Sequence, residues 1–105
     1  MRSRAARPGG TAPDRDTMTD MIARMWEVKG HSERIGELVA WTDGALSGIE
    51  TSPGCLGAQL FRSEDRVVVI TTWRDRDAAV DLPEPAPELI ARPPHAWDFT
   101  PVERH

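Results

Sequence analysis

The sequence predicts a small α+β domain whose elements follow the order β-α-β-β-α-β. Three patterns predict it: alternating apolar residues at 21–28, a long amphipathic stretch at 33–50, and two strand-like stretches at 56–62 and 66–73 joined by a polar turn. The last stretch contains the unbroken apolar run Val67–Ile70, which is typical of a strand covered on both faces. A chain of 105 residues does not easily cover both faces itself, so a second copy of the chain is expected to do so.

The first strand and the long helix each have one apolar side. In the strand at 21–28, alternation places Ile22, Trp26 and Val28 on one face together with Arg24. Ser32 is a plausible N-cap for the helix that follows. The apolar stripe of that helix consists of positions three and four residues apart, namely Ile35, Leu38, Val39, Thr42, Leu46 and Ile49. This stripe is expected to pack on the sheet.

The second helix of the pattern is short. Asp75 is a candidate cap for a helix at 76–82, and the prolines between 83 and 94 stop it within about two turns. A further strand is expected at 96–102, where Pro101 is compatible only with an edge strand or a strand end.

Composition restricts the domain organisation and the partners. Residues 1–19, rich in Arg, Pro and Gly, are expected to be a disordered tail, and 20–105 one domain; Met18 and Met21 are alternative candidates for the initiator. The net charge of −4 argues against nucleic acid as a partner, and no apolar run is long enough to suggest a membrane span. The single cysteine, Cys55, excludes an internal disulfide and fits a cytoplasmic location.

Three segments carry a resemblance to a known family. They are Met21-Ile22-Ala23-Arg24, Pro53-Gly54-Cys55-Leu56-Gly57, and the run from Val67 to Asp75 that contains Trp73. With these segments, the chain from Met21 to Val102 resembles the antibiotic biosynthesis monooxygenase (ABM) family of dimeric α/β-barrel proteins. The resemblance implies a ferredoxin-like βαββαβ subunit with a four-stranded antiparallel sheet. It also implies a homodimer in which two sheets meet face to face, and an apolar pocket between sheet and helices in each subunit.

The resemblance also implies an activity. Several relatives need no metal, flavin or haem cofactor: they bind an aromatic polyketide- or quinol-like molecule, deprotonate it, and let the resulting carbanion react with oxygen. The expected function is therefore that of a cofactor-independent monooxygenase with a small aromatic ligand and no cofactor. Two alternatives stay open. One is a non-enzymatic dimeric protein that binds small ligands or is associated with stress, and the other is a cyclase or isomerase on the same fold.

The candidate catalytic residues are His95 and Arg24. Histidine is the side chain whose ordinary pKa lies closest to neutrality, and His95 lies near the expected pocket mouth, so it is the candidate general base. Arg24 is the candidate for stabilising a phenolate or enolate; the alternative, which we prefer, is an ion pair with Asp98 on the neighbouring strand or an outward orientation. Cys55 is interpreted as a small apolar residue at a bend, and no spacing of His, Cys, Asp or Glu predicts a metal site.

Three tryptophans are candidates for substrate binding. The resemblance places Trp73 at a pocket, although a tryptophan at a strand end also serves to fill the core. Trp26 is expected on the adjacent strand, where a core or dimer-interface role is the alternative. Trp97 is the third possible member of an aromatic wall.

Overall fold

The structure, a computed structural model, describes residues 20–102 of the chain. The predicted tail, residues 1–19, lies outside the described residues. Within the described part, no helix is both long enough and apolar enough to cross a membrane.

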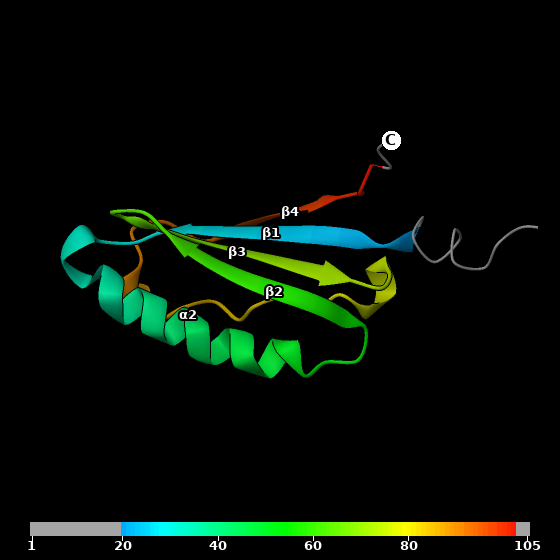
Figure 1. The fold of residues 1–105 in the computed structure, drawn as a ribbon. Coiled ribbons are helices and arrows are strands. Elements are labelled where there is room, and N and C mark those ends of the chain that lie inside the picture. Colours follow the sequence, from blue (N-terminus) through cyan, green and yellow to red (C-terminus); the bar gives the residue numbers. More distant parts are fainter. Residues whose placement is uncertain (1–19, 103–105) are drawn as a thin grey trace, which may run out of the picture.

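The described residues form one helix packed on a four-stranded antiparallel sheet, which confirms the predicted α+β, ferredoxin-like fold (Figure 1). The sheet consists of β1 (Ile22–Lys29), β2 (Cys55–Arg62), β3 (Arg66–Trp73) and β4 (His95–Phe99), in the order β2-β3-β1-β4. The helix α2 spans Ile35–Glu50 between β1 and β2. This order places β2 and β4 at the two edges and the most apolar strand, β3, in the interior.

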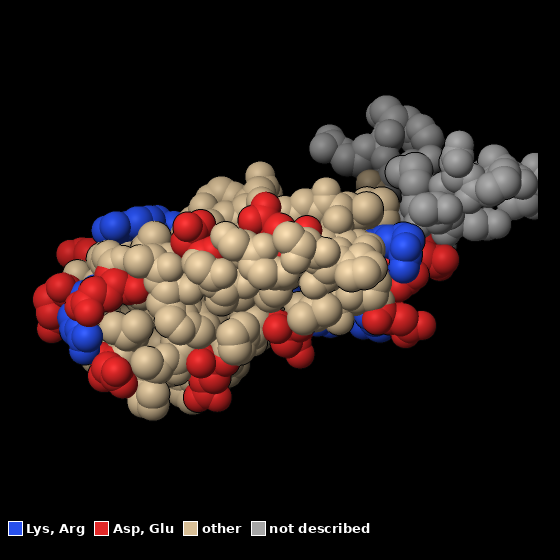
Figure 2. All heavy atoms as spheres, turned by 90° about the horizontal axis from the view of Figure 1, so that it is seen from below, with Lys and Arg blue, Asp and Glu red and all other residues tan. Residues whose placement is uncertain are grey.

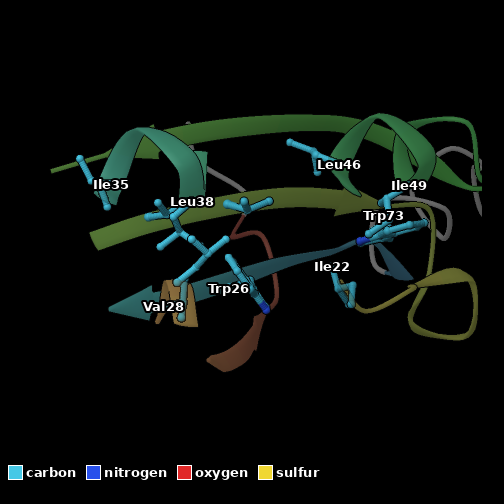
Figure 3. Packing of buried hydrophobic residues seen from close by; sticks show 11 residues of the cluster. Ile22, Trp26, Val28, Ile35, Leu38, Leu46, Ile49 and Trp73 are labelled. Atoms are coloured by element: carbon cyan, nitrogen blue, oxygen red, sulfur yellow. The ribbon is translucent and has the colours of Figure 1, made fainter. Parts of the chain in front are cut away.

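The core lies between α2 and one face of the sheet. The buried positions of α2 are five of the six predicted for its apolar stripe: Ile35, Leu38, Thr42, Leu46 and Ile49. They meet the alternate residues of β1 and β3 that point to the same side, among them Val67 and Val69. Figure 3 shows Leu38 beside Val28, and Trp73 near Ile49 at the other end of the helix. The apolar residues recur about every 3.6 positions in α2 and every second position in β1 and β3. Both patterns therefore place their apolar side chains in the same core layer.

The helix begins differently from the prediction. Ser32 is the first residue of a 3-10 turn, Ser32–Arg34, rather than a cap, and the residue before it, His31, makes no side-chain capping hydrogen bond. Arg34 instead forms an ion pair with Glu37 of the first helical turn, with Nε 2.8 Å from Oε2.

The return from α2 to β2 depends on Gly54. Its φ of +87° lies in the left-handed region that favours glycine. A Cβ at this position would lie 2.6 Å from the Cβ of Ala78, and the carbonyl of Gly54 accepts a hydrogen bond from the backbone N–H of Arg74. The Pro-Gly-Cys step thus needs glycine for both its backbone conformation and its close packing.

The predicted second helix is largely absent from the described chain. Asp75 caps as expected, since its carboxylate accepts a hydrogen bond from the N–H of Ala78, but only the 3-10 turn Arg76–Ala78 follows. The next segment runs over the same sheet face as α2 and makes a second 3-10 turn, Pro87–Leu89, with Leu89 buried. Proline lacks the N–H that a helix interior needs, and its ring clashes with the preceding turn, so the segment covers the core as mostly extended chain.

β4 is shorter than predicted. It ends at Phe99 instead of continuing through Pro101, and it begins directly after Pro94. Pro101 therefore lies beyond the end of the strand, one of the two positions that the prediction allowed for it, and β4 is an edge strand.

The second face of the sheet has no helix over it among the described residues (Figure 1). We call this surface the open face. Cross-strand pairs place Phe61 opposite Val68, Trp97 opposite Met25 and Phe99 opposite Ala23 on it. Phe61, Trp97 and Phe99 are 47%, 46% and 53% exposed. The face that carries α2, by contrast, shows acidic side chains spread along its length (Figure 2).

Candidate functional site

A groove of about 300 Å³ lies where β1 and β4 meet residues 79–94, which we call the proline-rich segment, on the same side of the sheet as α2. We call it the β4 groove. Its lining comes from Trp26 of β1, from Asp81, Leu82 and Glu84 of the proline-rich segment, and from Pro94, His95 and Ala96 around the start of β4. The volume is at the lower end of the range for small-molecule sites. The groove offers an indole wall with carboxylates at its border.

Trp26 is held firmly at this groove. It is only 5% exposed, lies in the core cluster, and pairs with Val69 on one side and Ala96 on the other. The small side chain of Ala96 leaves room beside the indole on the edge strand. The tryptophan therefore belongs both to the core and to the groove wall.

Arg24 is fully engaged in ion pairs. Its Nε and Nη2 donate to the two carboxylate oxygens of Asp98 at 2.6 and 2.9 Å, and its Nη1 donates to Asp81 at 2.7 Å. Asp98 lies directly opposite Arg24 on β4 and also accepts from Arg76 at 3.2 Å. The hydrogen bond with Asp98 raises the pKa of Arg24, and the same bond lowers the pKa of Asp98 below its ordinary value. This is the arrangement that the sequence offered as the alternative to a catalytic role.

His95 lies at the lip of the groove. The alternation of β4 places its side chain with that of Trp97, and the two rings stack with centroids 6.0 Å apart and planes 27° apart. Trp97 pairs with Met25 on the open face, whereas Ala96 and Asp98 face the α2 side with Trp26 and Arg24. The structure thus places His95 and Trp97 together, but on the other side of the sheet from Trp26.

Trp73 is separate from the groove. It is completely buried under α2, and its Nε1 donates to the hydroxyl of Thr71 at 2.8 Å. That bond satisfies the only polar atom of the indole within the core. Trp73 is not among the residues that line the β4 groove.

Two acidic residues of the groove, Asp81 and Glu84, do not emerge from sequence reasoning. The sequence signal that could have found them is the alternation of acidic residues and prolines at 81–85, because prolines keep the chain extended and so hold the two carboxylates apart.

A larger hollow of about 420 Å³ lies at the opposite end of β1 and is lined mainly by polar and acidic residues, including Asp75 and Asp77. It lacks an aromatic wall, so the β4 groove is the better candidate for an apolar planar ligand.

The family model for "antibiotic biosynthesis monooxygenase" matches residues 21–81 of the chain. No curated protein matches the sequence. Among solved structures, the chain is similar to Rv0793 from Mycobacterium tuberculosis, with 19% identity and a TM-score of 0.66 over 80% of this chain and 97% of that one.

Two further structures share the fold. A conserved protein from Methanosarcina mazei has 10% identity and a TM-score of 0.65, over 81% of this chain and 96% of that one. SnoaB from Streptomyces nogalater, a cofactor-independent oxygenase, has 18% identity and a TM-score of 0.53, over 81% of this chain and 96% of that one. At such identities the likeness concerns the fold alone.

Proposed function

The chain belongs to the antibiotic biosynthesis monooxygenase family, and from that premise we propose that it is a cofactor-independent monooxygenase whose aromatic, polyketide- or quinol-like substrate binds in the β4 groove. The observation that carries the proposal is the indole of Trp26 at the wall of a groove of about 300 Å³. A planar aromatic ligand gains both apolar burial and ring contact at such a wall.

The proposed chemistry is a two-step reaction. A base removes a proton from the bound phenol or the acidic carbon, and the electron-rich carbon then attacks oxygen. One oxygen atom stays on the substrate as a carbonyl and the other leaves as water, so a CH₂ group plus O₂ gives C=O plus H₂O. Glu84 is the proposed base because it lines the groove on the side of the sheet that carries Trp26. The side chain of His95, the base that the sequence predicted, lies with Trp97 on the open face.

Arg24 has a supporting role in this proposal. Each of its three nitrogens already donates a hydrogen bond to Asp98 or Asp81. It therefore ties β1, β4 and the proline-rich segment together beside the groove. We assign it to positioning rather than to direct contact with a substrate anion.

The test is oxygen uptake with a dihydroxynaphthalene, for which one O₂ gives one hydroxynaphthoquinone and one water. The full chain should consume oxygen above the protein-free rate, and Trp26→Phe should lower the rate chiefly by raising KM. Trp41→Phe on α2 makes the same change outside the groove and should leave the rate unchanged. His95→Gln and Glu84→Gln then identify the base. Equal loss in both tryptophan variants would contradict the assignment of the groove.

The non-enzymatic alternative is favoured by one observation, the complete engagement of Arg24 in ion pairs. A protein of that kind would be stabilised by the aromatic ligand in a thermal-shift assay and would consume no oxygen. A cyclase or isomerase would convert the ligand without oxygen uptake. The same set of reactions, followed by oxygen electrode and by product mass, separates the three.

The proposal includes a cytoplasmic homodimer formed through the open face. The support is the row of large, half-exposed apolar side chains on that face, of which Phe61 and Trp97 are examples. Sedimentation should give twice the subunit mass of 11.7 kDa. Phe61→Glu should produce monomers, whereas Val80→Glu, at an exposed valine of the proline-rich segment, should not. A monomeric wild type would contradict the proposed assembly.

A further inference from the structure

A small basic pocket lies on the open face of the sheet, at the end of β1 and the start of β4, and thus across the sheet from the β4 groove. Its volume is about 110 Å³, and it is lined by Lys29, Arg66, Arg92 and His95 together with Pro93 and a single carboxylate, Glu27. We call it the basic pocket. It is below the size of ordinary ligand pockets but has room for one charged group.

The pocket holds positive charge in an acidic body. Residues 20–102 contain eight Lys and Arg against fourteen Asp and Glu, a net charge of −6. Three of those eight cations line this pocket. Such a local excess is not a consequence of overall composition.

Two of the cations, Lys29 and Arg66, lie next to each other on neighbouring strands, and their repulsion destabilises the sheet. Lys29 of β1 lies directly opposite Arg66 of β3, and like charges in directly opposed pairs destabilise a sheet. Arg66 is compensated by Glu27, with Nη1 3.0 Å from Oε2, while the pairing of Lys29 with Asp65 is longer, at 3.9 Å.

The third cation, Arg92, is fixed in place by its backbone. The N–H of Ala91 donates to the carbonyl of Lys29 at 2.8 Å, and Ile90 forms an isolated bridge with Gly30. Pro93 follows at once and restricts the chain further. No ion pair within residues 20–102 involves Arg92, so its guanidinium adds uncompensated charge to the pocket.

We propose that the basic pocket binds the oxyanion group of a small ligand, a phosphate or a carboxylate. Guanidinium groups bind both groups through paired N–H donors, and an anion would also offset the repulsion between Lys29 and Arg66. The inference is independent of the proposed oxygenase activity, since Lys29, Arg66 and Arg92 do not line the β4 groove. In the proposed homodimer, an anion bound here would lie on the face at which the two subunits meet.

The test is an amide chemical-shift titration of the ¹⁵N-labelled full chain, in one arm with inorganic phosphate and in the other with acetate, at constant ionic strength. We expect saturable shifts at Lys29, Arg66 and Arg92 with a Kd of about 1 mM or tighter in at least one arm. Saturation by phosphate alone identifies a phosphate ligand, and saturation by acetate identifies a carboxylate ligand. Shifts that stay linear in both arms overturn the proposal.

Matched variants identify the pocket as the site. Arg92→Gln should weaken binding at least about fivefold, because one of the three cations is lost. Arg62→Gln removes the same charge at the same end of the sheet, from a residue that does not line the pocket, and should leave the Kd unchanged. Glu27→Gln should tighten binding, since it removes the only lining carboxylate.

Two results would contradict the proposal even if anions bind. One is equal weakening by Arg92→Gln and Arg62→Gln, which would indicate nonspecific attraction. The other is an Arg92→Gln variant with unchanged anion affinity but altered dimerisation, which would show that a second copy of the chain, rather than a small anion, occupies the pocket.

Discussion

Replacing Arg24 by methionine separates a positioning role from a catalytic one. Methionine keeps most of the side-chain length and removes all three ionic hydrogen bonds. The two bonds to Asp98 are protected, since the Arg24 and Asp98 side chains are 17% and 20% exposed, whereas Asp81 is 75% exposed. A hydrogen bond to a charged partner contributes about 1.5–3 kcal/mol, and an exposed ion pair contributes about 0–1 kcal/mol.

The expected loss in the free energy of unfolding is therefore about 2–3 kcal/mol for Arg24→Met. Asp81→Asn, which weakens only the exposed bond, should cost less than about 1 kcal/mol. The assay is urea unfolding followed by tryptophan fluorescence at one fixed protein concentration, because assembly would make stability depend on concentration. Equal losses in the two variants, or a loss for Arg24→Met below about 0.5 kcal/mol, would refute the argument from burial.

The same pair predicts a pH dependence. Arg24 lowers the pKa of Asp98 in the folded state, so the stabilisation is present above the ordinary pKa of an aspartate. It is lost as pH falls through the lower, folded-state pKa. The wild type should therefore lose stability in acid more steeply than Arg24→Met or Asp98→Asn.

The Arg24→Met variant also tests the positioning role. If the well-folded variant bound the aromatic ligand but consumed no oxygen, Arg24 would have to be assigned to the chemical step.

Three glycine substitutions should affect stability differently: one should destabilise the fold, one should be nearly neutral and one should stabilise it. Gly54→Ala should cost about 2–4 kcal/mol, from the left-handed φ together with the close approach to Ala78, whereas Gly57→Ala meets no atom within 4 Å and should change stability by less than about 0.5 kcal/mol. A small effect at Gly54 would contradict the described turn. Gly44→Ala on the solvent side of α2 has open space for its Cβ and should stabilise by about 0.5–1 kcal/mol in the same urea assay. Ala40→Gly should produce the reverse change, and destabilisation by Gly44→Ala would mean that this helix face is covered.

Local patterns were sufficient to predict the strands and the long helix. Alternation in β1 and the apolar stripe of α2 identify the buried side because each residue's direction follows from its own element. The sequence also suggested the ion pair between Arg24 and Asp98, which lie directly opposite each other on β1 and β4. These predictions need only the elements and their order.

The path of the proline-rich segment was not predictable in the same way. Prolines show where a helix stops, but not that Pro85 and Leu89 are buried over the sheet, which depends on the space that α2 leaves. The position of His95 depends on the alternation of β4, since moving a strand by one residue exchanges its two faces. The sequence therefore suggested Trp26 and His95 for the candidate site, without indicating that the sheet separates their side chains or that Asp81 and Glu84 line the groove.

The prolines around β4 have a consequence for assembly. An exposed edge strand can template the addition of strands from other molecules, and this one is five residues long, with Pro94 before it and Pro101 shortly after it. A neighbouring chain that tried to extend the sheet there would soon meet residues that have no N–H to donate. Fibril growth by the addition of strands to β4 is therefore disfavoured, even though aromatic side chains lie close by.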